Sequence, residues 1–177
     1  MALAIISYPT ISDADRDWIK AFPEAHSKLL TPDTDPHFTF VFPFRGVSPD
    51  KVIAFAKEKL AAQAAIPFAI RAAIPVKEYE SEYTYLYLVP DDGLSAMIRL
   101  HDYLYTDLLE KQLNLDIPFF PHITAGHARK ADLVKEIADD INVQNREIQG
   151  TIETMSVVKT SRSGVEVLEN IQLTESF

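Results

Sequence analysis

Short apolar runs and amphipathic stretches alternate along the whole chain. Apolar runs bounded by Pro or Gly are typical of strands, whereas apolar positions three and four residues apart are typical of helices. Helix starts are further marked by Ser or Asp caps and by Pro at the first helical position. In the first half these signals predict a strand at 2–8, a helix from Ser12 or Asp13 towards Lys28 with a kink or break at Pro23, a strand at 36–44, a helix at 51–65 and strands at 66–76 and 83–89.

The second half repeats this order of elements. Its first apolar stripe has helical spacing and includes His101, which we expect to be a hydrogen-bonded core residue. The pattern predicts a helix at 93–113, a strand at 117–125, a helix at 131–141 and a hairpin of strands at 147–159 and 165–173 around Ser161–Gly164.

This order of elements indicates an α+β fold with mostly antiparallel sheet and outer helices. No Pro-rich or Gly-rich linker separates the two halves, so we expect them to pack on each other. The prediction is a single bilobal domain over residues 1–177, with two small sheets related by a pseudo-twofold axis around a central cleft.

Composition restricts the classes of partner and of chemistry. The 177 residues carry 17 Lys and Arg against 26 Asp and Glu, and this net charge of −9 argues against a protein that coats nucleic acid. A small anionic ligand needs only a local pocket of donors. The chain has no cysteine, which excludes disulfides and thiolate chemistry. No apolar run approaches the roughly 18 residues of a membrane span, so we expect no membrane partner and a cytoplasmic, monomeric protein.

A Pro-His-x-Thr pattern occurs twice in the chain. Each copy falls on an expected strand that is followed by a helix, which indicates an internal duplication. On a strand, residues i and i+2 face the same side, so His37 projects with Thr39, and His122 projects with Thr124. If a pseudo-twofold axis relates the halves, two imidazoles and two hydroxyls meet in one site.

Such a site suits in-line displacement at phosphorus. One histidine takes a proton from the attacking oxygen while the other gives a proton to the leaving oxygen, and a pKa near neutrality serves both roles. The two hydroxyls stabilise charge on the equatorial oxygens. We expect His122 to be the base and His37 the acid, although the pseudosymmetry leaves the reverse assignment open.

The two motifs, His37-Phe38-Thr39 and His122-Ile123-Thr124, resemble those of the 2H phosphoesterase superfamily. The segment 119–124, Phe-Phe-Pro-His-Ile-Thr, is most similar to the 2′-5′ RNA ligase and cyclic phosphodiesterase branch. The resemblance covers nearly the whole chain and implies a bilobal fold, two catalytic histidines, two phosphate-binding threonines, and no metal or other cofactor. It also implies a nucleotide or RNA-end substrate, with opening of 2′,3′-cyclic phosphates, trimming of RNA ends or 2′-5′ joining as the reaction.

The sequence departs from the family where members often carry an Arg after the second motif. This chain has Gly126-His127 there, so His127 is either a phosphate ligand when protonated or an ordinary strand-end residue. Strict alternation sends His127 to the face opposite His122 unless the strand ends or bulges before it. Further candidates for an anionic substrate are Arg45, Lys77, Lys159 and Arg162, and candidates for stacking on a base are Tyr79, Tyr83 and Tyr85, each with an ordinary surface or packing interpretation.

Several alternatives stay open at this stage. A metal site formed by His37 and His122 with Asp35 or Asp116 is disfavoured, because each histidine is paired with Thr rather than with a second strong ligand. A ligase or RNA-end processing enzyme would use the same four residues on a longer substrate. A nucleotide-binding module without turnover, and a purely structural protein, are the two interpretations without catalysis.

Overall fold

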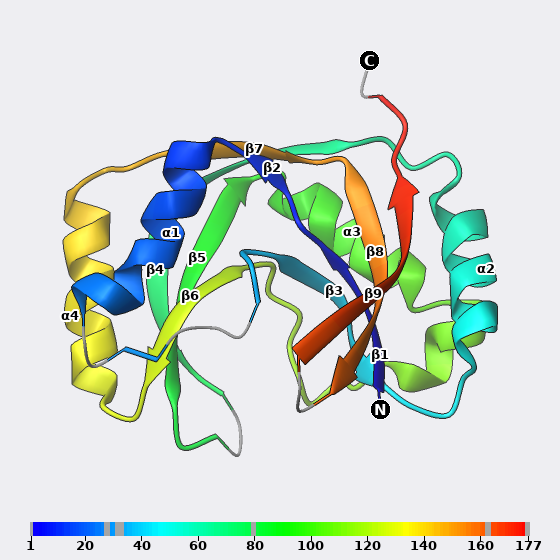
Figure 1. The fold of residues 1–177 in the computed structure, drawn as a ribbon, viewed down its shortest axis with the longest axis horizontal. Helices are drawn as coiled ribbons and strands as arrows, with labels where there is room; N and C mark the ends of the chain where they lie inside the picture. Colours follow the sequence, from blue (N-terminus) through cyan, green and yellow to red (C-terminus); the bar gives the residue numbers. More distant parts are fainter. Residues whose placement is uncertain (1, 27–28, 31–33, 79–80, 162–163, 176–177) are drawn as a thin grey trace.

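The computed structural model describes residues 2–26, 29–30, 34–78, 81–161 and 164–175. Its strands form two antiparallel sheets (Figure 1). The first sheet has the order β3-β1-β8-β9 and contains β1 (Ala2–Ser7), β3 (Phe38–Phe44), β8 (Thr154–Ser161) and β9 (Gly164–Gln172). The second has the order β2-β7-β4-β5-β6 and contains β2 (Thr10–Ile11), β4 (Ile66–Lys77), β5 (Thr84–Asp92), β6 (Ile123–Ala128) and β7 (Ile148–Ile152).

In the part of the chain that the structure describes, four α-helices cover the outer sides of the two sheets. The helices α1 (Asp13–Ala25) and α4 (Ala131–Val143) pack on the second sheet, and α2 (Pro49–Leu60) and α3 (Leu94–Leu104) pack on the first. In Figure 1, α1 and α4 stand at one side of the molecule and α2 at the opposite side, while α3 lies between them. No helix in the described ranges is long and apolar enough to cross a membrane.

The two halves of the chain follow one plan and exchange elements. The series β1-α1-β3-α2-β4 corresponds to β5-α3-β6-α4-β8, and β3-β1-β8 in one sheet matches β6-β5-β4 in the other. The last strand of each series therefore lies in the sheet of the other half, since β4 pairs with β5 and β8 pairs with β1. Helix α1 of the first half packs near β6, and α3 of the second half packs near β3. The predicted pseudo-twofold arrangement of an α+β fold is confirmed.

The edge strands β3 and β6 are each covered by residues from the other half of the chain, which limits pairing of these edges with other chains. On the open edge of β3, His101 donates from Nδ1 to the Phe40 carbonyl at 2.8 Å, and Tyr105 Oη accepts from the Phe42 amide at 2.9 Å. On the edge of β6, Leu30 exchanges two backbone hydrogen bonds with His127. His101 is buried, so the predicted role in the core is confirmed.

Three sequence-based boundaries were wrong. The helix expected at 93–113 ends at Leu104, and a 3₁₀ helix (Asp107–Gln112) follows, whose first residue, Asp107, has a φ of +49°. The strand expected at 117–125 begins only at Ile123, because Phe119 packs flat on His101 instead of pairing in a sheet. The strand expected at 147–159 is split into β7 and β8.

The break that the sequence suggested at Pro23 is not seen, because the helix α1 continues through that residue to Ala25. Its Ser12 cap accepts a hydrogen bond from the Asp15 amide, as predicted. The other predicted strands and helices are present within a few residues of their expected bounds. The tip of the 161–164 hairpin lies partly outside the described residues, but Ser161 pairs with Gly164.

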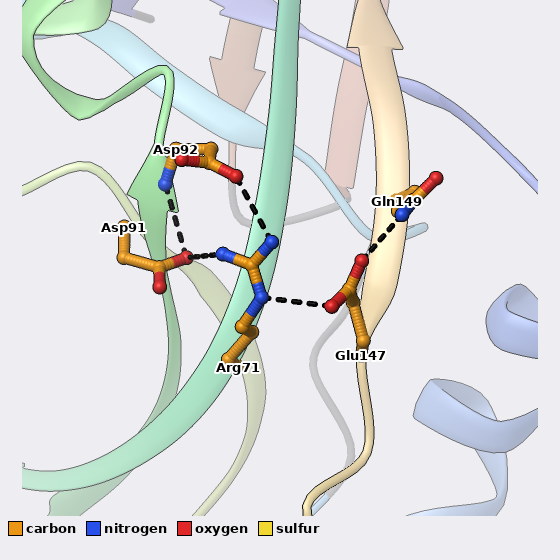
Figure 2. A network of polar contacts seen from close by, with 5 residues as sticks. All are labelled: Arg71, Asp91, Asp92, Glu147 and Gln149. Atoms are coloured by element: carbon orange, nitrogen blue, oxygen red, sulfur yellow. Dashed lines mark hydrogen bonds and ion pairs between the residues drawn. The ribbon is translucent and has the colours of Figure 1, made fainter.

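One polar network ties three strands of the second sheet together (Figure 2). Arg71 of β4 donates to Asp91 and Asp92 at the end of β5 and to Glu147 beside β7, over distances of 2.7 to 2.9 Å. Because three carboxylates surround one guanidinium, this Arg is fully engaged in holding the sheet together.

Candidate active site

Both histidines of the repeated motif were expected within strands, but each lies one residue before a strand. His37 precedes β3 and His122 precedes β6, while Thr39 and Thr124 are the second residues of these strands. The starts of β3 and β6 approach each other in the centre of the molecule (Figure 1). The two imidazoles are close enough that a charge on His37 lowers the pKa of His122. The fold therefore brings together residues that are far apart in the sequence.

The same backbone contact orients both imidazoles. His37 Nδ1 donates to the carbonyl of Asp35 at 2.8 Å, and His122 Nδ1 donates to the carbonyl of Phe120 at 2.6 Å. Each acceptor lies two residues before its histidine. With the Nδ1 proton held in this way, Nε2 of each neutral ring carries the lone pair that can accept a proton from a ligand.

The surroundings of the two rings differ. Tyr87 of β5 stacks on His122 with 3.5 Å between ring centroids and 12° between the planes, and its hydroxyl donates to Glu78. His37 has a looser aromatic neighbour, Tyr8, at 5.9 Å and 59°. Burial and the bond to Glu78 raise the pKa of Tyr87, so its phenol stays protonated.

These environments make the histidines unequal as acids. Burial lowers the pKa of His122 to about 4, against the raising effect of its bond to the Phe120 carbonyl, and His37 lowers it further. Burial also lowers the pKa of His37, and its bond to Asp35 opposes this shift. At neutral pH the structure therefore favours a neutral His122.

The two threonines lie at equivalent points of the two sheets. Thr39 is opposite Ile6 of β1, and Thr124 is opposite Tyr87 of β5, the strand that corresponds to β1. Both side chains are half-buried, as are His37 and His122. In the second sheet Thr124 therefore lies directly opposite Tyr87, whose ring stacks on His122.

A bulge in β6 decides where His127 points. Tyr87 pairs with Thr124 and Leu86 pairs with Gly126, so Ala125 has no partner on β5. This extra residue shifts the alternation by one position, and His127 comes to the side of Thr124. Its ring lies 5.3 Å from that of Tyr85 and 5.0 Å from that of Tyr83.

The remaining candidates divide clearly. The rings of Tyr83 and Tyr85 lie beside that of His127. Sequence analysis missed two residues of the site, Tyr87, which stacks on His122, and Glu78, which accepts a hydrogen bond from the Tyr87 hydroxyl. Tyr87 had a detectable signal, since it continues the alternation of Tyr83 and Tyr85 along a strand.

The charged candidates lie elsewhere on the surface. Lys159 is paired with Glu166, and Asp35 is paired with Lys20. Arg45 and Lys77 are exposed at strand ends. Arg162 and Tyr79 lie outside the described residues. In the described ranges no three His, Asp or Glu side chains are grouped as metal ligands would be.

Comparison with known proteins agrees with this arrangement. The sequence pattern of the 2′-5′ RNA ligase superfamily matches residues 11–164. The chain therefore belongs to this superfamily, a group of 2H phosphoesterases. No curated protein sequence matches the chain.

Solved structures share the fold at low sequence identity. TT0787 of Thermus thermophilus superposes with a TM-score of 0.64 at 15% identity, covering 100% of both chains. LigT of E. coli gives 0.59 at 15% identity with 98% of both chains covered, and it has also been solved complexed with NADP+, 3′-AMP and ATP. Usb1 of Kluyveromyces marxianus gives 0.57 at 9% identity, covering 97% of this chain and 98% of that chain.

Proposed function

We propose that the protein is a metal-independent phosphodiesterase that opens a 2′,3′-cyclic phosphate at the end of a nucleotide or RNA. The observation that carries the proposal is the matched anchoring of two neighbouring imidazoles. His37 and His122 each donate from Nδ1 to a carbonyl two residues back. Both Nε2 atoms are thereby available for proton transfer to and from one ligand, which is the requirement for displacement at phosphorus.

The proposed reaction is attack of water on the cyclic phosphorus. The water oxygen forms a bond to phosphorus while the bond from phosphorus to one ribose oxygen breaks. One histidine takes the proton that the water loses, and the other gives a proton to the ribose oxygen. The hydroxyls of Thr39 and Thr124 donate to the equatorial oxygens as charge develops on them.

We assign the base to His122 and the acid to His37. A pair that shares one proton holds it on the more basic ring. Burial under Tyr87 disfavours the charged form of His122 more strongly, whereas His37 has a looser aromatic neighbour and Thr34 Oγ1 at 3.1 Å from its Nδ1. The proton therefore belongs on His37 before attack.

Two further observations support a nucleotide as the substrate. E. coli LigT, which shares the fold, has been solved with 3′-AMP, ATP and NADP+. In this chain the half-buried rings of Tyr85 and His127 lie together beside the histidine pair, and such aromatic rings stack on bases.

The test is hydrolysis of the four 2′,3′-cyclic nucleotides in EDTA by the wild-type protein, His37→Asn and His122→Asn. The Asn amide can keep the contact to the i−2 carbonyl but cannot transfer the proton, so each variant should lose about 10²- to 10⁴-fold in rate. His26→Asn is the matched control, because His26 makes a similar Nδ1 contact to the Phe22 carbonyl at the end of α1. Equal rates in all four proteins would refute the mechanism.

The family description favours 2′-5′ joining as a second candidate function. In that reaction a 5′-hydroxyl replaces water as the attacking group, and the 3′ oxygen leaves the phosphorus. The same two proton transfers apply. Formation of a 2′-5′ linkage from an RNA with a cyclic phosphate and an RNA with a free 5′-hydroxyl would identify it.

A further inference from the structure

A cavity of about 350 Å³ lies at the end of β6, beyond the histidine pair. Six residues line it: Leu30, Tyr83, Ala128, Arg129, Lys130 and Leu133. They come from the segment that covers the edge of β6, from the residue before β5, and from the junction between β6 and α4. The histidine mechanism uses none of them.

A row of aromatic rings connects the cavity to the histidine pair. Tyr87 stacks on His122, and its ring centroid is 6.1 Å from that of Tyr85. The ring of His127 follows at 5.3 Å from Tyr85, and Tyr83 is 5.0 Å from His127. The bulge at Ala125 completes this row, because it brings His127 to the side of Thr124.

The lining combines apolar walls with cations at the rim. Leu30 is exposed, and Leu133 and Tyr83 are half-buried. The guanidinium of Arg129 lies 5.6 Å over the Tyr83 ring and pairs with Glu82 at 3.0 Å. Lys130 is exposed and has no ion pair with any residue that the structure describes. Apolar walls beside cations suit a nucleobase that carries a phosphate.

We propose that this cavity is a second nucleoside subsite, which holds the nucleotide preceding the one that carries the cyclic phosphate. The inference rests on the proposed function, since it takes the histidine pair as the place of the scissile phosphate. The terminal nucleoside stacks along Tyr85, and the preceding base enters between Tyr83 and Leu133. The phosphate that links the two nucleotides lies near Lys130. The preferred substrate is then an oligonucleotide end of at least two nucleotides.

The length of the row agrees with two nucleotides rather than one. Tyr83 and Tyr87 are four residues apart, which is roughly 14 Å at about 3.4 Å per residue of strand. A nucleoside attached to a phosphate at His122 occupies the nearer part of this length. The remaining part ends in the cavity and takes a second nucleoside.

The experiment compares adenosine 2′,3′-cyclic phosphate with the dinucleotide ApA that ends in a 2′,3′-cyclic phosphate. For each, kcat/KM is measured on the wild-type protein, Leu30→Ser and Lys130→Gln. The matched controls are Val143→Ser, an exposed apolar residue at the far end of α4, and Lys51→Gln, an exposed lysine of α2 on the other sheet. We expect the wild-type protein to favour the dinucleotide at least tenfold, and both cavity variants to lose most of this preference.

Binding without turnover separates failure of the subsite from failure of the proposed reaction. Calorimetry of 3′-AMP and of ApA with a 3′-phosphate should give at least tenfold tighter binding of the dinucleotide, and Lys130→Gln and Leu30→Ser should reduce this difference. If neither cyclic substrate is hydrolysed but this difference is found, the reaction is wrong and the subsite stands. Equal affinities for the two ligands, or cavity variants that behave like their controls, would overturn the subsite.

Discussion

The phenol ring of Tyr87 lies flat on the imidazole of His122, with 3.5 Å between the centroids and 12° between the planes. The Tyr87 hydroxyl donates to Glu78, and the residue is only 4% exposed. The contact fixes one face of His122 while its Nδ1 is held by the Phe120 carbonyl. His122 is therefore restrained from two directions, whereas its counterpart His37 has only a tilted aromatic neighbour, Tyr8.

Replacement of Tyr87 should separate the role of the ring from that of the hydroxyl. Tyr87→Phe keeps the stack, so we expect the pKa of His122 to stay low and the rate to fall by less than about threefold. Tyr87→Leu removes the flat cover and admits water, so the pKa of His122 should rise towards 6.5 and kcat should fall about tenfold or more. NMR titration of the His122 ring, together with kcat, checks both. Identical titrations in the two variants would contradict a positioning role for the ring.

The pH dependence of hydrolysis should be shifted to the acid side. The active form has His122 neutral and His37 protonated. His122 loses its proton at a pKa of about 4, and burial holds the pKa of His37 below 6.5. We therefore expect kcat/KM to reach its maximum between about pH 4 and 6.5 and to fall as the pH rises through the pKa of His37. A maximum above about pH 7.5 would show that the free protein does not use this pair of ionisations.

The pseudosymmetric α+β fold could be predicted from the sequence, because the order of elements depends on local patterning. The repeated motif also predicts that His37 lies with Thr39 and His122 with Thr124, and the structure places each pair at the start of equivalent strands. The catalytic roles of these four residues stay a prediction. The features that the sequence did not predict depend on contacts between segments that are distant in the chain. Phe119 belongs to a run that favours a strand, but it packs on His101 of α3 instead.

The sequence offered Tyr83, Tyr85 and His127 as separate candidates, but their assembly into one row was out of reach for the same reason. The unpaired Ala125 follows from the pairing of β6 with β5. The adjacent Gly126 is a residue type that often marks a bulge, but local sequence does not decide whether or where the strand bulges. The side on which His127 lies is decided by that bulge. Leu30 comes to the edge of β6 through backbone bonds alone, which leave no mark in the side-chain pattern.

The threonine hydroxyls should matter for the transition state. Thr39→Val and Thr124→Val keep the β-branched shape that a strand favours and remove only the hydroxyl. We expect each to lower kcat/KM by about 10- to 100-fold, since loss of one donor to a developing charge costs up to about 10³-fold. Thr154→Val is the control, because its hydroxyl bonds to Gln172 in the β8–β9 hairpin. Rates within about twofold of the wild type for both site variants would exclude a role for these hydroxyls.

Gly150 allows β2 to approach β7 and β4. A Cβ at this position would lie 2.6 Å from Ile11 Cγ2, 2.6 Å from Phe68 Cζ and 2.7 Å from the Thr10 carbonyl oxygen. Gly150→Ala should therefore lower the free energy of unfolding by about 1–3 kcal/mol. Gly126→Ala is the matched comparison, because its nearest neighbour is a Leu29 methyl at 3.3 Å, which can move. Urea unfolding of both variants tests the difference, and equal midpoints would contradict close packing at Gly150.

Acid should destabilise the fold in part through His122. In the unfolded chain this histidine binds a proton near pH 6.5, whereas the folded chain binds it only near pH 4. Between these values unfolding takes up a proton, so the free energy of unfolding falls as the pH is lowered. At about 1.4 kcal/mol per unit over this interval, His122 accounts for up to about 3.5 kcal/mol of this loss. His37 and His101, whose pKa values burial also lowers, add to it in the same direction.

The variant His122→Asn isolates this contribution, because it removes the titrating ring and can keep the bond to the Phe120 carbonyl. The free energy of unfolding, measured with urea at intervals from about pH 7 to pH 4, should fall less steeply in the variant than in the wild-type protein. His26→Asn, which removes a histidine at the end of α1, is measured alongside as the comparison for loss of a histidine outside the pair. Parallel curves for His122→Asn and the wild type would mean that His122 titrates equally in the folded and unfolded chains.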